Sequence, residues 1–304
     1  MLTSVQTAGI LDAYGLDRGF AMIAEAGLDG VDLNLDQLLS GRAITRGELN
    51  GFFDKSDGEL REALRPCKEA AQRHGVRFIQ AHAPFPTWVS DARTNEYVLM
   101  AIQKTIMLCG YLECRHLVVH PCIIMDDPAL ERKENLRTYS ALIPALREHD
   151  VICCLENMFS SRRGKLTEAI CSDPDEAVRY IDELNALAGE GLFGFCLDVG
   201  HATLLGKDIR RFIDALGDRL LITHVHDNNG FDDEHLFPYM GITDWDRFCR
   251  ALGENGYKGA LSFETYNALA TFDRALAPQL MNLLGATAKL LAGRVEEARA
   301  AAER

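Results

Sequence analysis

The sequence predicts an α/β protein built as a single (β/α)8 barrel, the TIM barrel. Apolar, β-rich runs alternate with longer amphipathic stretches, eight such runs occur, and no glycine-rich phosphate loop follows the first one. Strict alternation is typical of a parallel sheet covered by helices, and eight units suffice to close it into a barrel. A doubly wound open sheet is the alternative, but it usually carries that phosphate loop. We expect one domain over residues 1–304, with an exposed or frayed helical tail at about 294–304.

The strands are predicted from the apolar runs, taken in chain order. They are Leu2–Thr7, Gly30–Leu35, Arg77–Ala83, His116–His120, Val151–Glu156, Phe193–Asp198, Leu220–Asp227 and Ala260–Thr265. The stretches between them are predicted helices, and a glycine just after the last turn supplies the left-handed cap of many of them. The glycines in that position are Gly27, Gly75, Gly110, Gly217 and Gly256. One helix start is also clear, because Asp173 can cap a helix whose first turn holds Pro174.

Composition limits the classes of function. The net charge of −13 weighs against nucleic acid and anionic membranes as partners, because binding either requires Lys and Arg to neutralise phosphates. No run approaches the roughly 18 apolar residues of a membrane span, so we expect a cytoplasmic protein. The nine cysteines lack zinc-finger spacing and lie in strand-like and helical patterns, as buried, reduced thiols do. The sequence leaves the oligomeric state open, and a homo-oligomer is among the states it allows.

Acidic residues interrupt the later strand runs at their carboxyl ends, where barrels of this kind carry their chemistry. Glu156, Asp198 and Glu264 each follow an apolar run on a different strand. Burying a charge without a partner is very costly, so three acids at one barrel mouth indicate a bound divalent cation. His224 adds a nitrogen ligand. Two Glu, one Asp and one His favour Mn²⁺, Mg²⁺, Co²⁺ or Zn²⁺ over a thiolate-bound metal.

The seventh predicted strand carries two histidines on one face. Residues two apart in a strand point the same way, so His224 and His226 should both face into the barrel or both face out. His224 lies deeper and is the better ligand. His226 is expected to support that ligand or to contact substrate.

Seven motifs carry a resemblance to a known superfamily: AHAPF, VVHP, LENM, CLDVGHA, THVHDN, DEHLFPYMGITDW and LSFETY. With them the chain resembles the xylose isomerase-like TIM-barrel superfamily, which includes ketose 3-epimerases, hydroxypyruvate isomerase, inosose dehydratase and the endonuclease IV class of abasic-site nucleases. The epimerase pattern implies a metal held by Glu156, Asp198, His224 and Glu264. It also implies that Glu156 and Glu264 move a proton through an enediolate, and that His201 contacts the substrate.

The resemblance leaves several activities open. A metal-dependent isomerase or epimerase of a small sugar or sugar derivative is the favoured reading, although the arginine that those epimerases place after the strand-seven histidine is replaced here by Asn228-Asn229-Gly230. The endonuclease pattern implies two or three zinc ions and phosphodiester hydrolysis, but the acidic chain lacks the basic face that DNA requires. The endonuclease pattern also implies additional metal or substrate positions at His82, His120, His201, Asp233 and His235. A dehydratase would share the enediolate, and a non-catalytic carbohydrate-binding protein would not need the glutamate pair.

Two long loops, Asp36–Asp57 and the one after Glu156, are expected to cover the site. The second contains Arg162, Arg163 and Lys165, a basic group that is expected either to grip a substrate phosphate or carboxylate or to form a solvated loop. Trp88 is expected to contact the substrate. Aromatic walls suit a sugar ring, and the other candidates for them are Phe159, Phe237, Tyr239 and Trp245.

Overall fold

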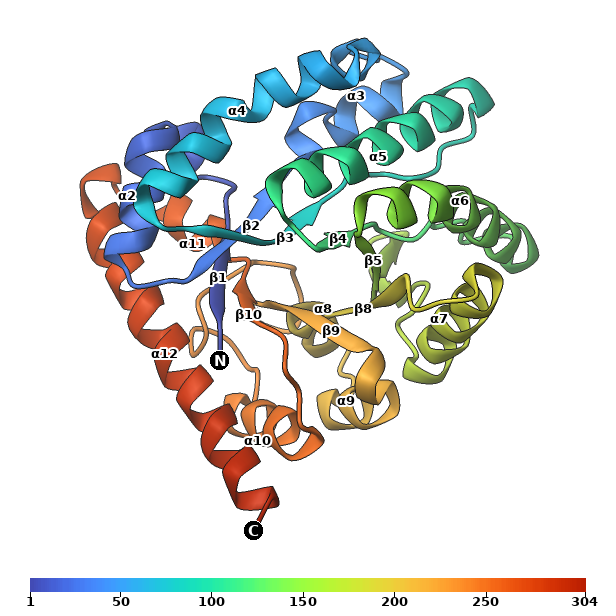
Figure 1. Ribbon diagram of the computed structural model, residues 1–304. Coiled ribbons are helices and arrows are strands. Elements are labelled where there is room, and N and C mark those ends of the chain that lie inside the picture. The colour runs from blue at the N-terminus through green and yellow to red at the C-terminus, as the bar shows by residue number, and fades with distance from the viewer.

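The computed structural model describes all residues 1–304 and confirms the predicted barrel (Figure 1). Eight parallel strands close in the order β1-β10-β9-β8-β5-β4-β3-β2. Each overlaps one predicted strand, and several end one or two residues earlier than predicted. The barrel strands are β1 (Thr3–Gln6), β2 (Gly30–Asn34), β3 (Arg77–His82), β4 (His116–Val118), β5 (Ile152–Glu156), β8 (Phe193–Asp198), β9 (Leu220–Val225) and β10 (Leu261–Phe263).

Helices surround the barrel (Figure 1). They are α1 (Leu11–Tyr14), α2 (Leu16–Glu25), α3 (Gly41–Arg46), α4 (Asp57–His74), α5 (Ala92–Leu112), α6 (Pro128–His149), α7 (Pro174–Ala188), α8 (Val199–Leu204), α9 (Ile209–Leu216), α10 (Trp245–Asn255), α11 (Tyr266–Thr271) and α12 (Ala277–Ala302), with short 3₁₀ turns at Asp36–Leu38, Phe52–Asp54, Gly217–Arg219 and Arg274–Leu276. The predicted tail is therefore the last part of α12, which stays helical to Ala302.

The helix ends largely follow the capping signals. Asp173 accepts a hydrogen bond from the Glu176 amide at the start of α7, and Gly75 and Gly256 end α4 and α10 in the left-handed conformation. The prediction for Gly110 is wrong, because α5 continues to Leu112 and Glu113 takes the left-handed position. Gly110 instead allows close packing of α5 on α6: a Cβ there would lie 3.0 Å from the Cβ of His149.

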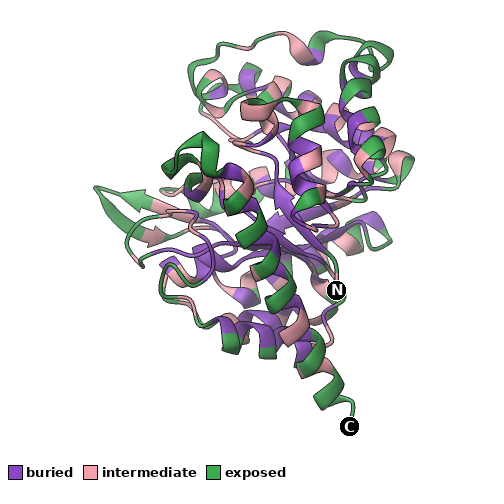
Figure 2. Ribbon diagram, turned by 90° about the vertical axis from the view of Figure 1, so that its left-hand side faces the viewer, coloured by how far each residue is buried: buried purple, intermediate pink, exposed green.

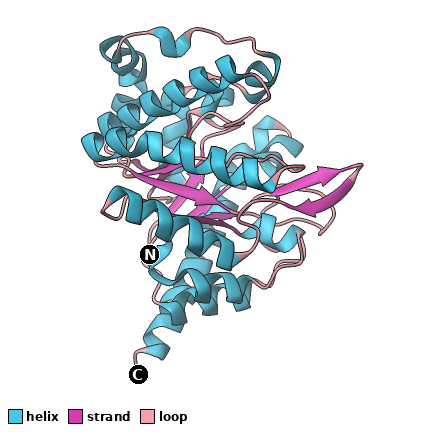
Figure 3. Cartoon of the chain, turned by 90° about the vertical axis from the view of Figure 1, so that its right-hand side faces the viewer, coloured by secondary structure: helices cyan, strands magenta, loops and turns pink.

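The loop after β5 forms a two-stranded hairpin, which the sequence analysis did not predict. Strand β6 (Phe159–Arg162) pairs antiparallel with β7 (Lys165–Glu168). Arg163 and Gly164 join them, both with positive φ, as a two-residue hairpin turn requires. Figures 2 and 3 show this hairpin projecting from the body of the molecule, with its far end exposed.

The main core lies between the barrel and its helices and contains 74 buried hydrophobic residues. A second, small cluster of Val118, Cys154, Cys196 and Ile222 lies on four adjacent strands. The other four strands carry polar residues that are also fully buried, with Ser4 paired in register with Ser262 and Asp32 paired with Gln80. The barrel interior is thus apolar on one side and polar on the other.

All nine cysteines are free and buried. None of the helices combines the length and the apolar character that crossing a membrane would require.

Candidate metal centre

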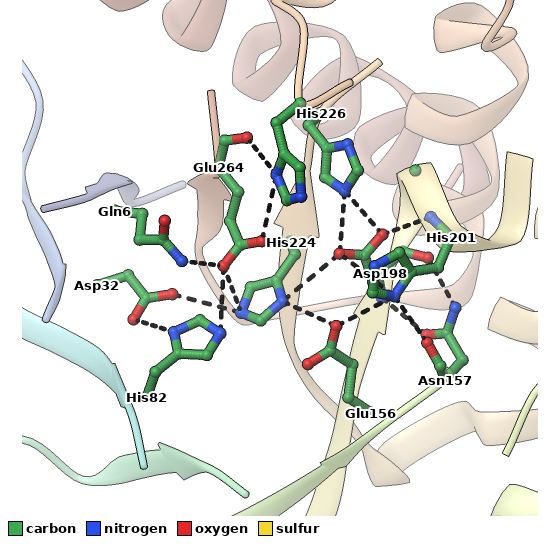
Figure 4. Close-up of polar contacts among 12 residues, drawn as sticks. Gln6, Asp32, His82, Glu156, Asn157, Asp198, His201, His224, His226 and Glu264 are labelled. Atoms are coloured by element: carbon green, nitrogen blue, oxygen red, sulfur yellow. Dashed lines mark hydrogen bonds and ion pairs between the residues drawn. The ribbon is translucent and has the colours of Figure 1, made fainter. Parts of the chain in front are cut away.

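The carboxyl ends of the barrel strands bring together histidines and carboxylates that lie far apart in the sequence (Figure 4). They fall into overlapping groups of three or four residues, and within each group the ligand atoms lie within 4.8 Å of one another. The members are Asp32, His82, His120, Glu156, Asp198, His201, His224, His226, Asp233, His235 and Glu264. Every residue that the sequence analysis placed in the metal set or among the additional metal positions is included. Asp32 was not predicted.

His224 lies at the centre of this cluster and is completely buried. Its Nδ1 is 3.4 Å from Glu156 Oε1 and 3.7 Å from Asp198 Oδ2. Its Nε2 is 3.3 Å from Asp32 Oδ2 and 3.7 Å from Glu264 Oε1. Glu156 and Asp198 therefore face one edge of the ring, and Glu264 faces the other. The four residues of the predicted metal set meet at this imidazole, as members of two groups that share His224.

Local backbone contacts at the ends of β8 and β5 position Asp198 and His201. Asp198 ends β8 and caps α8, so that its Oδ1 accepts a hydrogen bond of 2.6 Å from the His201 amide. Asn157, just after β5, pairs with the backbone of Asp198 through two hydrogen bonds of 2.8 Å. The backbone carbonyl of Asn157 also lies 2.9 Å from His201 Nδ1. Asn157 thus fixes both residues.

The remaining histidines each lie against a carboxylate of the cluster. His120 Nε2 is 2.9 Å from Glu156 Oε2, and His82 Nε2 is 3.2 Å from Glu264 Oε1. His226 Nε2 is 3.0 Å from Asp198 Oδ1. His224 and His226 therefore lie on the same side, as predicted, and both are buried.

Asp233 and His235 lie in the long segment between β9 and α10. Their side chains meet at 3.0 Å, and Asp233 Oδ2 is 3.6 Å from His201 Nε2. Asp227 holds the segment in place, because its carboxylate accepts hydrogen bonds from the backbone amides of Asn228, Tyr239, Gly241 and Thr243 and from the indole of Trp245.

Asp32 is the main site residue that sequence reasoning missed. It lies within β2, is completely buried, and accepts hydrogen bonds of 2.9 Å from Gln80 Nε2 and from the His82 ring. The sequence signal for Asp32 is an acidic residue inside the apolar run GVDLN. The prediction considered acids at the strand ends, and Asp32 lies within its strand. Gln6 was also missed, and its amide donates to Glu264 Oε1.

Electrostatics keep the buried carboxylates of Glu156 and Asp198 ionised. Burial raises the pKa of Glu156, but the positive charges of His120 and His224 outweigh burial and hold that pKa well below its usual value. His201 and His226 do the same for the pKa of Asp198. The carboxylates in turn raise the pKa values of two imidazoles. Burial lowers the pKa of His82, but Asp32 and Glu264 raise it to about 9, and the pKa of His201 rises to about 10 beside Asp198 and Asp233.

This donor set fits a divalent cation. Both ring nitrogens of His224 are buried without a hydrogen-bond partner, although four carboxylates surround the ring. Carboxylate oxygens and imidazole nitrogens are ligands for Zn²⁺, Mn²⁺ and similar ions. In the metal-free protein, protonated imidazoles supply the positive charge; a bound cation would supply it with the imidazoles neutral.

The other predicted contacts lie around this cluster. The ring of Phe159, at the base of the hairpin, packs on His201 with centroids 4.9 Å apart. Arg162 pairs with Asp126 at 2.6 Å and is exposed, as are Arg163 and Lys165 at the hairpin end. Trp88 is partly buried in the segment after β3. Trp245 and Phe237 are buried, and Tyr239 is exposed.

The chain is similar in sequence to one protein family and to uncharacterised proteins. A family model described as "Xylose isomerase-like TIM barrel" matches residues 20–285. An uncharacterised protein, y4fM of Sinorhizobium fredii, is 29% identical over 271 residues, covering 83% of this chain and 81% of its own. The uncharacterised protein MJ1311 of Methanocaldococcus jannaschii is 30% identical over 217 residues, covering 67% and 69%.

Solved structures share the fold. A D-tagatose 3-epimerase-like protein superposes with a TM-score of 0.70 at 20% identity, over 97% of this chain and 100% of that one. D-allulose 3-epimerase from Methylomonas gives 0.71 at 17% identity, over 96% and 98%. The IOLI protein, solved with a bound zinc atom, gives 0.69 at 18% identity, over 98% and 99%.

Proposed function

The chain belongs to the xylose isomerase-like TIM barrel family, and from that premise we propose that it is a divalent-metal-dependent isomerase or epimerase of a small sugar or sugar derivative. The observation that carries this proposal is the placement of Glu156 and Glu264 at opposite edges of the His224 ring. A pair of buried carboxylates at the mouth of a barrel suits proton transfer to and from carbon. Neighbours of this fold include sugar epimerases.

Glu156, Asp198, His224 and Glu264 would hold the ion. When bound, a divalent cation supplies a Lewis acid that polarises a substrate carbonyl and stabilises the negative charge that develops on it. The donor chemistry suits Mn²⁺, Zn²⁺, Co²⁺ or Mg²⁺.

The chain's own carboxylates would move the proton. A sugar C–H beside a carbonyl is a weak acid, and a positioned carboxylate that accepts its proton contributes roughly 10²–10⁴-fold to the rate. The low pKa of Glu156 keeps that carboxylate ionised at neutral pH. Because the two glutamates approach His224 from opposite edges, we propose that one removes the proton and the other returns it on the opposite face, which inverts the carbon centre.

Other residues would orient the substrate. His201 and His226 lie beside Asp198 and present ring nitrogens that can bind sugar hydroxyls. Phe159 covers His201 and offers an apolar face to a sugar ring. We retain Trp88 as a further wall and the cationic hairpin end as a contact for an anionic group.

A zinc-dependent phosphodiesterase is a second candidate, and one observation favours it. His82, His120, His201, Asp233 and His235 form further groups beside the predicted metal set, as a site for two or three ions would require. The net charge of −13 opposes DNA binding. A dehydratase would begin with the same proton removal and differ only in its product.

Metal analysis followed by product analysis tests the proposal. The purified protein should contain a divalent metal, and NMR should show conversion of at least one ketose, keto-sugar derivative or sugar phosphate in a panel. Loss of water from the substrate would identify a dehydratase. Two or three zinc ions per chain with cleavage of abasic-site DNA and no turnover of any sugar would refute the isomerase.

A further inference from the structure

Asp32 makes its hydrogen bonds inside the barrel, beneath the predicted metal ligands. Its Oδ1 lies 2.9 Å from His82 Nδ1, and its Oδ2 accepts a 2.9 Å hydrogen bond from Gln80 Nε2. Asp32 is completely buried, and His82 and Gln80 are also buried. A carboxylate accepts hydrogen bonds and donates none, and the Gln80 amide is already the donor at the second oxygen of Asp32. His82 must therefore carry a proton on Nδ1.

This arrangement determines what the other nitrogen of His82 can do. In the neutral ring with Nδ1 protonated, Nε2 presents a lone pair, and that atom faces Glu264 Oε1 at 3.2 Å (Figure 4). A lone pair and a carboxylate oxygen repel each other at this distance unless a positive charge lies between them. A proton can supply the charge, and so can a metal ion that both atoms bind.

Asp32 itself is poorly suited to bind the ion. N–H groups already occupy both of its oxygens, whereas both ring nitrogens of His224 have no hydrogen-bond partner. A carboxylate that accepts from the far nitrogen of a histidine is the arrangement that fixes the tautomer of metal-binding imidazoles and makes them more basic.

We propose that Asp32 is a positioning residue that holds His82 in the Nδ1-protonated form, so that His82 Nε2 binds a divalent cation together with Glu264. This inference rests on the proposed metal site and extends it, because a buried strand residue that does not touch the ion determines which nitrogen of His82 is free to bind it. His82 and His224 stack with centroids 4.6 Å apart, so movement of one ring would also displace the other.

The test is NMR of the full chain labelled with ¹⁵N-histidine and loaded with ¹¹³Cd²⁺, with the His82 signals assigned by their loss in His82→Asn. We expect a proton on Nδ1 and a cadmium coupling at Nε2. Asp32→Asn should remove or move this coupling and weaken cadmium binding about 10–100-fold in chelator competition. Asp29→Asn is the matched control, because Asp29 is also a β2-proximal acid that accepts a structural hydrogen bond, from the Thr3 amide. It should leave both readouts unchanged.

Three outcomes would overturn the inference. A coupling at Nδ1 of His82, or none at either nitrogen while cadmium binds elsewhere in the site, would refute it and leave the proposed function standing. Unchanged coupling and affinity in Asp32→Asn would make Asp32 purely structural. Failure of the wild-type protein to bind any divalent cation would remove the proposed function as well. If Asp32→Asn does not fold, the wild-type spectrum still decides the tautomer and the bound nitrogen.

Discussion

The backbone of Gly200 lies directly against the imidazole of His226: a Cβ on Gly200 would be 1.9 Å from His226 Cε1. Gly200 is in the first turn of α8, and His226 follows β9, so this contact joins the two segments that carry Asp198 and His224. The glycine is required for space, since its φ is not in the left-handed region.

Gly200→Ala should therefore displace His226 from Asp198. We expect a loss of about 1–3 kcal/mol in the free energy of unfolding, as overpacking of a buried site typically costs, together with weaker metal binding. Gly293→Ala in α12 is the matched control, because nothing lies within 4 Å of its Cβ position, and it should be neutral or stabilising. Thermal unfolding and metal titration measure both effects. Equal stability and metal affinity in the two variants would show that the His226 ring moves aside freely.

The carboxylate of Asp227 organises the segment that carries Asp233 and His235. Asp227→Asn keeps the size of the side chain but places an NH₂ group among donors that need an acceptor. We expect a loss of about 2–3 kcal/mol and faster hydrogen exchange at the amides of Tyr239 and Gly241, measured by NMR or mass spectrometry.

Asp244→Asn is the control for that experiment. Asp244 caps α10 by accepting a single hydrogen bond from the Arg247 amide, and Asn caps helices about equally well. Unchanged exchange in Asp227→Asn would contradict the anchoring role.

The raised pKa values of the imidazoles predict how the stability of the metal-free protein depends on pH. The pKa of His82 is about 9 and that of His201 about 10, above the ordinary value of 6.5 expected in the unfolded chain. The stabilisation that these two protonated imidazoles give the folded state is therefore fully present below about pH 6.5. It is lost as the pH rises through 9 and 10. The Tm of chelator-treated protein should fall over this range.

A bound metal should counteract this loss. Neutral imidazoles bind cations and protonated ones do not, so the difference in Tm between metal-loaded and metal-free protein should widen as the pH rises. His82→Gln should flatten part of the fall in the metal-free protein. A metal-free Tm that stays constant or rises from pH 6.5 to 9.5 would contradict these assigned charges.

Arg163 lies in the turn at the end of the β6–β7 hairpin, four residues and therefore about 13 Å from Phe159 at about 3.3 Å per residue. A sugar phosphate bound at the metal site could extend toward it. Arg163→Ser should therefore raise KM for a phosphorylated or carboxylated substrate and leave kcat and Tm nearly unchanged. Arg250→Ser, at an exposed position on α10, is the charge-matched control. The same KM in both variants, or a preferred substrate without charge, would rule out this contact.

The barrel could be predicted because the sequence pattern that indicates its strands and helices repeats along the chain. Parallel strands buried on both faces read as continuous apolar runs, and the acids that end them, Glu156 and Asp198, are visible where those runs stop. Their convergence at one end of the barrel follows from the parallel arrangement alone.

The unpredicted features depend on contacts between distant segments. Asp32 resembles an ordinary strand residue until β3 brings His82 and Gln80 to its carboxylate. Gly110 follows the pattern of a helix cap, but its role is the close approach of α5 to α6. The acid inside the apolar run GVDLN marks Asp32 as unusual, but no local pattern identifies its partners or those of Gly110.

The central claim is that Glu264 both holds the metal and carries a proton, and deuterium wash-in tests it most directly. Glu264→Gln keeps the shape and one oxygen ligand but cannot accept the proton. Wild-type protein should exchange the hydrogen beside the carbonyl of at least one ketose or ketose phosphate with solvent deuterium. The variant should retain metal and lose exchange by about 10²-fold or more. Cleavage of abasic-site DNA by the wild type, without exchange on any sugar, would contradict the account.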